Sequence, residues 1–354
     1  MAKKVLIKGN EAIAEAAIQS GCKAFYGYPI TPQTEVSAYM AKQMPKSGGV
    51  FLQAESEIAA INMIYGAAGT GVRCMTSSSS PGISLKAEGI SYIAGAELPC
   101  VIVNMMRGGP GLGGIQPAQS DYFQATRGIG HGDFSMPVFA PASIQEMVDC
   151  IGEAFDIADE YRTPVMVVGD GMIGQMMEPV EFKARESRQL PEKDWAANGL
   201  GERTKHNVIN SLYLKADELE KHNQHLQRKY RQIKEKEVRY ELYNTEDADV
   251  ILVAYGTTAR ICRSTIALAE EAGIKVGLVR PISLWPFPVE AFEKTIDSTK
   301  HGFLTVEMSE GQMVQDVQLA VLGRKPVEFY GRSGGMMPEP EAILEKIKTM
   351  AGGN

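Results

Sequence analysis

An alternation of short apolar runs with helical stretches, from residue 4 to about residue 178, constrains the fold more than any other feature of this sequence. It is typical of a mainly parallel sheet covered by helices, because parallel neighbours need a crossover connection. Local signals predict Asn10 as the cap and Gly21 as the stop of the first helix, and Thr31 and Pro32 as the cap and first residue of the second. Strands are expected at residues 23–28, 72–76, 100–106, 136–140 and 163–168.

A polar stretch follows this first α/β unit. Residues 179–211 are rich in Pro, Gly and Asn, which marks the end of a domain. From about 212 to 242, apolar residues recur every seven positions, which predicts one long amphipathic helix packed on a subunit surface. The heptad residues are Leu212, Leu219, Leu226, Ile233 and Tyr240.

A second alternating block begins at Asp249–Gly256 and ends with a helix expected near Pro340–Met350. Its length of roughly a hundred residues suits one small α/β domain. The sequence therefore predicts a first domain over residues 1–180, a polar linker with the long helix over 181–246, and a smaller α/β domain over 247–354.

Composition argues against several classes of protein. The net charge of −7 and a pI near 5.5 disfavour nucleic-acid binding, which depends on clustered Lys and Arg. Residues 1–17 hold only a short apolar run, so neither a signal peptide nor a membrane span is expected, and a cytoplasmic location follows. The five cysteines include no CxxC pair, so reduced thiols are expected, with no zinc or iron–sulfur site in this chain.

Several segments, taken together, carry a resemblance to a known family. GYPITPQTE, LQAESEIAAINMIYGAAGTG and TSSSSPGISLKAEGISYIAGAELPCVIVNMMRGGPG resemble, in this order, the first subunit of the 2-oxoacid:ferredoxin oxidoreductases, and the likeness continues through QSDYFQATRG. LVAYGTTARI and LVRPISLWPFP look like the transketolase-type C-terminal domain of that family. The segments occupy residues 27–35, 52–71, 76–111, 119–128, 252–261 and 278–288.

The resemblance implies a fold and an activity. The fold is a parallel-sheet domain of the thiamine-diphosphate-binding type, followed by a smaller α/β domain like the C-terminal domain of transketolase. The activity converts a 2-oxoacid, CoA and oxidised ferredoxin to acyl-CoA, CO2 and reduced ferredoxin. The chain would be the alpha subunit, on the pyrimidine side of thiamine diphosphate. Its implied partners are a beta subunit that binds the diphosphate and magnesium, a gamma subunit and a ferredoxin-like subunit with iron–sulfur clusters.

Residues 86–133 look most like subunits that act on branched-chain acids such as 3-methyl-2-oxobutanoate. Subunits for 2-oxoglutarate share the same scaffold, so that acid stays an alternative. Two other classes also stay open. One is a non-catalytic scaffold subunit, whose long helix docks partners, and the other is a self-contained thiamine enzyme.

One buried glutamate is required by the implied chemistry. The cofactor acts as an electron sink, and its pyrimidine is activated by a carboxyl group at a ring nitrogen. Glu55 and Glu57 stand near the start of an expected helix, about 200° apart around it, so only one can face the cofactor. The resemblance selects Glu57 and adds Tyr28, Pro29 and Ile30 as cofactor contacts. The alternative role of Glu57 is a charge that favours a helix N-terminus.

Arg107 stands at the end of an expected strand, where open α/β sheets place their ligands. By resemblance its guanidinium holds the substrate carboxylate, and the hydroxyl of Thr31 donates a second hydrogen bond. The alternatives are a surface ion pair for Arg107 and a helix cap for Thr31. Ser77–Ser80 either approach the cofactor or form an ordinary turn, and many relatives have glycine at the position of Ser80. His131 either lines the mouth of the site or is a simple loop residue.

Two motif matches are not expected to bind ligands. The glycines of Gly109–Gly114, followed by Asp133, have a dinucleotide-binding spacing, but no helix is expected after them. Val168–Gly171 followed by Asn198 imitates the spacing with which thiamine enzymes hold magnesium and diphosphate. A polar, proline-flanked segment replaces the helix and strand of that motif, so diphosphate binding is expected in a partner chain.

Overall fold

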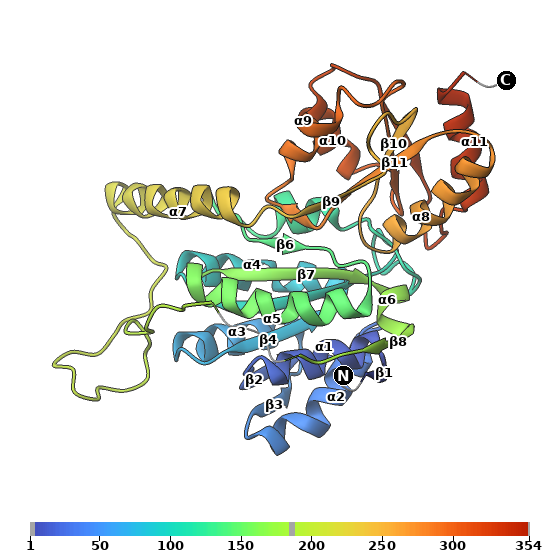
Figure 1. Cartoon of the computed structure of the whole chain (residues 1–354). Helices are drawn as coiled ribbons and strands as arrows, with labels where there is room; N and C mark the ends of the chain where they lie inside the picture. Colours follow the sequence, from blue (N-terminus) through green and yellow to red (C-terminus); the bar gives the residue numbers. More distant parts are fainter. Residues whose placement is uncertain (1–3, 184–187, 353–354) are drawn as a thin grey trace.

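The computed structural model describes residues 4–183 and 188–352, which form two mainly parallel sheets with helices on their faces (Figure 1). The larger sheet has seven strands in the order β12-β6-β7-β5-β4-β2-β3, and β12 pairs antiparallel with β6. The predicted α/β class is confirmed. The strands are β2 (Ala24–Gly27), β3 (Val50–Gln53), β4 (Cys74–Ser78), β5 (Cys100–Met106), β6 (Val138–Phe139), β7 (Pro164–Asp170) and β12 (Ser283–Trp285).

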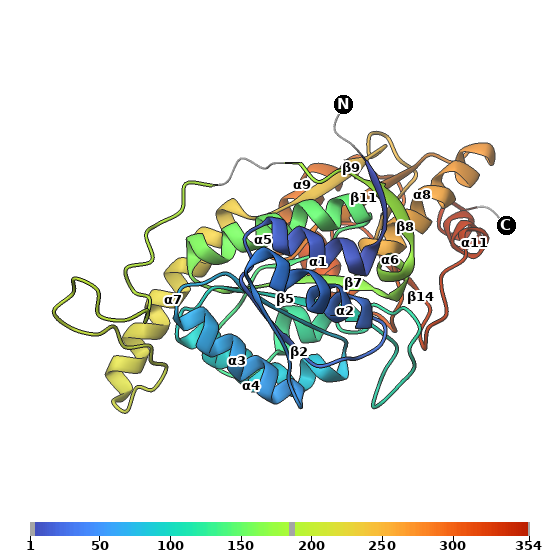
Figure 2. The same cartoon turned by 90° about the horizontal axis from the view of Figure 1, so that it is seen from below.

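Helices cover both faces of this sheet (Figures 1 and 2). Buried side chains of α3 and α4 belong to one core cluster, and those of α1, α2 and α5 belong to another. All five cysteines are buried. The helices are α1 (Gly9–Gln19), α2 (Thr34–Gln43), α3 (Glu57–Gly69), α4 (Pro81–Gly95) and α5 (Ile144–Tyr161), with the short α6 (Gly171–Gln175) after β7.

The smaller sheet has five strands in the order β14-β13-β10-β11-β9, of which β9 is antiparallel to β11. Its strands are β9 (Tyr240–Tyr243), β10 (Val250–Val253), β11 (Val276–Pro281), β13 (Phe303–Glu307) and β14 (Val327–Gly331). Its helices are α8 (Gly256–Glu271), α9 (Val289–Thr295), α10 (Met313–Val321) and α11 (Pro340–Met350). A separate antiparallel pair joins β1 (Val5–Lys8) to β8 (Met177–Val180).

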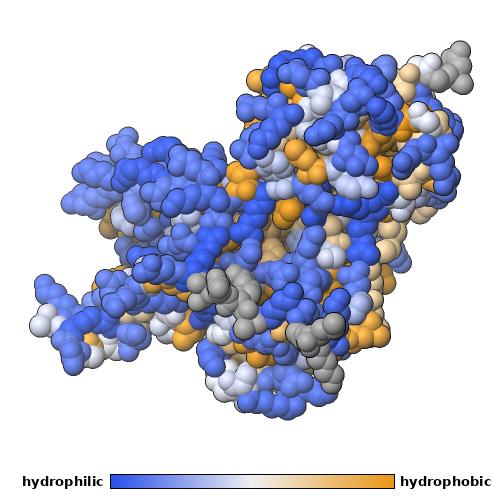
Figure 3. Space-filling model, viewed as in Figure 1, coloured by the Kyte–Doolittle hydropathy of each residue, from blue (hydrophilic) through white to orange (hydrophobic). Residues whose placement is uncertain are grey.

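The long helix is shorter than the sequence predicts. It is α7, Ala216–Lys236, and Tyr240 belongs to strand β9, because Tyr240–Tyr243 pair with β11 instead of continuing the heptads. Leu226 and Ile233 are buried, whereas Leu212 and Leu219 are 66% and 41% exposed. The helix therefore packs through its C-terminal half, and the face of α7 seen in Figure 3 is hydrophilic.

Two predicted helix boundaries are wrong. Asn10 lies inside the first turn of α1 and not at its cap, because its side-chain amide donates to the Pro32 carbonyl at 2.7 Å and to Glu35 at 2.9 Å. Thr31 and Pro32 do not begin α2, which starts at Thr34. They are the central residues of a turn, closed by a hydrogen bond from the Gln33 N–H to the Ile30 carbonyl. Contacts between elements thus override the local capping signals.

Among the described helices, none combines the length and the apolarity that crossing a bilayer requires.

Candidate active site

Glu57 is the first residue of α3, and the hydroxyl of Ser56 caps this helix by accepting from the Ala59 N–H at 3.1 Å. The Glu57 side chain is buried, with 6% of the residue exposed, whereas Glu55 is exposed. The carboxylate packs on Gly82, where a Cβ atom would lie 2.8 Å from Glu57 Oε1. No hydrogen bond to this carboxylate is found within residues 4–183 and 188–352, so its oxygens are available to a ligand.

Arg107 follows β5 directly and is buried, with 6% exposed. Its guanidinium donates to the carbonyl of Thr31 at 2.8 Å and to the carbonyl of Leu112 at 3.2 Å, and its Nε has no hydrogen-bond partner among the residues that the structure describes. The structure thus brings Arg107 and Thr31 into contact, but through the backbone oxygen of Thr31. Thr31 itself is exposed, and among the described residues no hydrogen bond joins its hydroxyl to Arg107.

Ser80 connects the start of α4 to Arg107. Its hydroxyl donates to Asp121 Oδ2 at 2.6 Å and accepts the backbone N–H of Arg107 at 3.0 Å. Asn104 donates to the same Asp121 oxygen at 3.0 Å. Burial raises the pKa of Asp121 above its usual range, although the hydrogen bonds from Ser80 and Asn104 and the charge of Arg107 oppose this shift. Sequence reasoning missed Asp121, because no local pattern marks it.

Consecutive buried serines run from Ser77 to Ser80, and of these Ser78 lies near Glu57. Within the described parts of the chain, the buried hydroxyls of Ser78 and Ser79 have no hydrogen-bond partner. A Cβ atom on Gly82 would meet both Ser78 Oγ and the Glu57 side chain. Ser77 donates to Gln33 Oε1 at 2.5 Å, which ties the loop after β2 to the end of β4. The predicted residues 27–33, 76–80 and 107 therefore meet at the carboxyl edge of the parallel sheet.

Tyr28, Pro29 and Ile30 lie on this loop after β2, with Tyr28 exposed and the other two half-buried. His131 lies elsewhere, on an exposed loop over the second half of α4. The backbone N–H of His131 donates to Ser91 Oγ at 2.9 Å, and the His131 ring packs edge-on against Tyr92.

Comparison with known proteins shows which family this chain is similar to. A family model described as "Pyruvate flavodoxin/ferredoxin oxidoreductase, thiamine diP-bdg" matches residues 15–243, and one described as "Pyruvate:ferredoxin oxidoreductase core domain II" matches 248–343. Ketoisovalerate oxidoreductase subunit VorB of Methanothermobacter thermautotrophicus is 49% identical over 98% of each chain. The 2-oxoglutarate synthase subunit KorA of Archaeoglobus fulgidus is 39% identical over 97% of this chain and 98% of its own.

The chain belongs to the 2-oxoacid:ferredoxin oxidoreductases, as an alpha-type subunit.

Solved structures agree with this membership. The 2-oxoglutarate:ferredoxin oxidoreductase of Magnetococcus marinus, with 2-oxoglutarate, coenzyme A and succinyl-CoA bound, matches with a TM-score of 0.87 and 26% identity, over 99% of this chain and 66% of that one. A split-gene transketolase, 15% identical, matches with a TM-score of 0.61 over 98% of both chains and so shares the fold. The predicted thiamine-type and transketolase-like architecture is confirmed.

The residues present suit the pyrimidine half of thiamine diphosphate, which the matched family model names as its ligand. A buried carboxylate without a hydrogen bond, two orphaned serine hydroxyls and a free Arg107 Nε are polar groups that a ligand can satisfy. The diphosphate half finds no comparable free polar groups, among the described residues, at Val168–Gly171 and Asn198, the motif that imitates a diphosphate site. Asp170 caps α6 through the N–H groups of Met172 and Ile173, and Asn198 accepts from Arg203 at 2.8 Å. Within the described residues, no cluster of acids, histidines and cysteines is arranged to hold a metal ion.

The glycine-rich loop after Arg107 also differs from a dinucleotide fingerprint. The Gly108 N–H donates to the Gln116 carbonyl and the Gly114 N–H to the Gly108 carbonyl, so the loop closes on itself. In the described chain no helix begins directly after Gly114.

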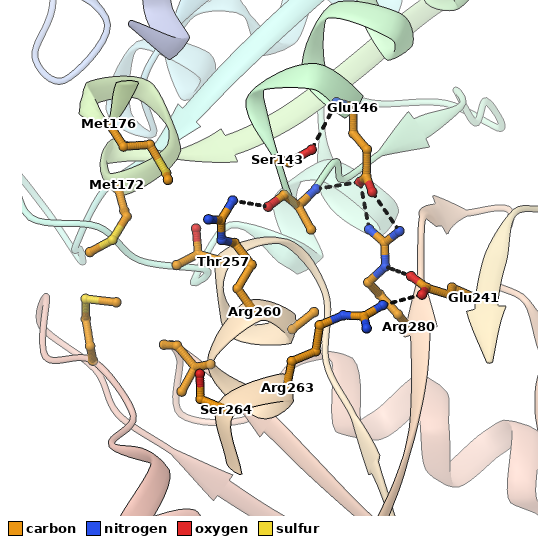
Figure 4. Close-up of a pocket in the computed structure, with 14 residues that line it drawn as sticks. Ser143, Glu146, Met172, Met176, Glu241, Thr257, Arg260, Arg263, Ser264 and Arg280 are labelled. Atoms are coloured by element: carbon orange, nitrogen blue, oxygen red, sulfur yellow. Dashed lines mark hydrogen bonds and ion pairs between the residues drawn. The ribbon is translucent and has the colours of Figure 1, made fainter. Parts of the chain in front are cut away.

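A cavity of about 570 Å³ lies between the two sheet domains of this alpha-type subunit, apart from Glu57 and Arg107 (Figure 4). Its arginines are ion-paired. Arg280 joins Glu146 of α5 to Glu241 of β9 at 2.8 Å each, and Arg263 also pairs with Glu241. These pairs hold the domain junction and leave little uncompensated charge for an anionic ligand.

Proposed function

We propose that this chain is the alpha subunit of an enzyme that oxidises a branched-chain 2-oxoacid, such as 3-methyl-2-oxobutanoate, with CoA and oxidised ferredoxin to acyl-CoA, CO2 and reduced ferredoxin. Relatives named as ketoisovalerate oxidoreductase subunits, 49% identical along nearly the whole chain, support this substrate class. The observation that carries a catalytic role is the buried carboxylate of Glu57, free of hydrogen bonds at the carboxyl edge of the sheet.

Thiamine diphosphate, when bound, supplies the electron sink for decarboxylation. Glu57 would hold its pyrimidine ring nitrogen and exchange a proton there, and Tyr28, Pro29 and Ile30 would flank the ring. Burial removes competing water from Glu57, which strengthens a charge-assisted hydrogen bond to the ring.

Arg107 would bind the carboxylate of the 2-oxoacid. Its guanidinium already lies at the sheet edge with Nε unpartnered, and an arginine can grip a carboxylate with two parallel hydrogen bonds. The contact with the Thr31 carbonyl fixes the guanidinium in advance, which lowers the entropy lost on binding. The hydroxyl of Thr31 stays a proposed second donor to the substrate.

The proposed partners complete the reaction. A beta subunit would bind the diphosphate and magnesium, and a ferredoxin-like subunit would carry the iron–sulfur clusters that pass electrons to ferredoxin. A gamma subunit completes the assembly. Relatives are themselves named as subunits, which supports an assembly in general.

A second candidate substrate is 2-oxoglutarate. KorA relatives are 34–39% identical over the whole chain, and the Magnetococcus enzyme binds 2-oxoglutarate. Turnover of each acid by the purified complex, with CoA and a viologen acceptor, separates the two substrates. The branched-chain acid is expected to have the higher kcat/KM.

The test of the catalytic role is Glu57→Gln in the purified complex. Loss of the acid is expected to lower kcat by about 100-fold or more, the usual range for a removed acid–base group, while the subunits stay assembled in gel filtration. Glu55→Gln is the matched control, since Glu55 is exposed two residues earlier and should keep full turnover. Retained turnover in Glu57→Gln would instead identify a non-catalytic scaffold subunit.

A further inference from the structure

Lys86 is a lysine in the core of the molecule. It lies on α4, between buried Ile83 and Ile90, and none of its surface is exposed. Lysine is almost never fully buried unless it is paired, because an ammonium loses its hydration there. Its burial alone therefore needs an explanation.

The ammonium has one hydrogen-bond partner within the described residues. Lys86 Nζ donates to Thr76 Oγ1 at 2.9 Å, and that hydroxyl donates onward to the Tyr26 carbonyl at 2.7 Å. An ammonium has three N–H groups, so one neutral hydroxyl does not account for the charge. An opposite charge nearby would do so.

Glu57 is that opposite charge. Gly82, on which the Glu57 carboxylate packs, lies four residues before Lys86 and so one turn away on the same face of α4. Burial lowers the pKa of Lys86 to about 8, and Glu57 is the one charged group that acts against this shift. From β4, the ammonium meets the neutral hydroxyl of Thr76.

We propose that Lys86 is a positioning residue for Glu57: a buried cation whose charge attracts the carboxylate and keeps it correctly oriented behind the cofactor. The inference rests on the proposed role of Glu57. Because Lys86 has no exposed surface, it cannot touch substrate and acts only through the glutamate. In a water-poor site, a nearby cation favours the charged form of a carboxylate and stabilises it after a proton has left it.

The experiment is a pH profile of kcat/KM for the 2-oxoacid, measured on the complete complex. Lys86→Met keeps the length of the side chain and removes its charge, so the acid limb should move up by about one pH unit, which is about tenfold in activity on that limb. Lys86→Gln should give the same shift, and it can still bond Thr76, so it provides the test if the Met variant does not assemble. Lys46→Met, which removes an exposed lysine charge, should leave the profile unchanged.

A double variant separates this inference from the proposed function. In a Glu57→Gln background, Lys86→Gln should cause no further loss, because the group on which it acts has gone. An unshifted acid limb in both Lys86 variants, with Glu57→Gln inactive, would overturn the role of Lys86 alone. Retained turnover in Glu57→Gln would overturn the proposed function itself.

Discussion

Ser80 adopts φ +25° and ψ −83°, outside the regions that residues with a side chain normally occupy. Such a conformation costs about 1–3 kcal/mol and needs support from its surroundings. Here the hydroxyl supplies it, through Asp121 and the backbone N–H of Arg107. The strained serine therefore connects the turn before α4 to the proposed substrate clamp.

This arrangement predicts an unusual order of stabilities. Ser80→Ala keeps the strained backbone and loses both hydrogen bonds, so the free energy of unfolding should fall by about 1–3 kcal/mol. Ser80→Gly loses the same bonds but removes the strain, so it should be more stable than Ser80→Ala. Urea denaturation of the purified chain measures both. An alanine variant as stable as the glycine variant would show that the backbone is not strained.

At the level of elements, α7 is held to the first domain by Glu97. Lys229 Nζ and His225 Nε2 each lie 2.9 Å from Glu97 Oε1, and the Glu97 side chain is 17% exposed. Burial would raise the pKa of Glu97, but Lys229 and His225 outweigh burial and lower it to about 2. The folded pKa is thus below the usual 4.5, so this stabilisation is present above pH 4.5 and is lost as the pH falls toward 2.

Glu97→Gln should loosen α7 at neutral pH. We expect a loss on the order of 2 kcal/mol, between the values for exposed and buried ion pairs, and faster hydrogen exchange along residues 222–229. Glu218→Gln is the matched control on the same helix, because its pair with Lys215 is exposed. Equal exchange rates in the two variants would mean that Glu97 does not anchor α7.

At the level of the whole molecule, the two sheets are parts of one packed body. Strand β12 follows β11 of the smaller sheet but completes the edge of the larger one. One core cluster includes Ile102 and Met166 of the first sheet together with Val253 and Phe292 of the second unit. Between them, the fully buried Gln119 donates to the Tyr255 carbonyl at 2.9 Å and accepts from Thr258 at 2.6 Å and from the Met308 N–H at 3.1 Å.

Gln119→Ala should therefore weaken the junction. It leaves the buried Met308 N–H and the buried Thr258 hydroxyl without their acceptor, each costing about 1–3 kcal/mol, so the melting temperature should fall by several degrees. The shared core predicts that unfolding stays a single transition. Gln116→Ala, at an exposed position nearby, should change little. Two separate melting transitions in the unaltered chain would contradict the shared core.

Local pattern predicted five of the seven strands of the larger sheet, but neither β3 nor β12. The strand predicted at residues 100–106 coincides with β5. A continuous apolar run of this length is typical of a parallel strand that is buried on both faces of its sheet. The sequence pattern places Glu55 and Glu57 on one helix, but α3 begins at Glu57, so the angular argument fails and the family resemblance alone selects Glu57. The structure buries Glu57 and exposes Glu55, and the catalytic role of Glu57 stays a prediction.

Only the tertiary structure decided the features that depend on partners distant in sequence. Tyr240 continues a heptad pattern but pairs with β11 as a strand, and Pro32 has the signal of a helix start but closes a turn held by Asn10. Likewise, the proposed role of Lys86, a lysine in an apolar helix face, depends on Glu57, which packs one helical turn away. Periodicity and capping act over a few residues, whereas these hydrogen bonds and charges act between segments that meet only after the chain has folded.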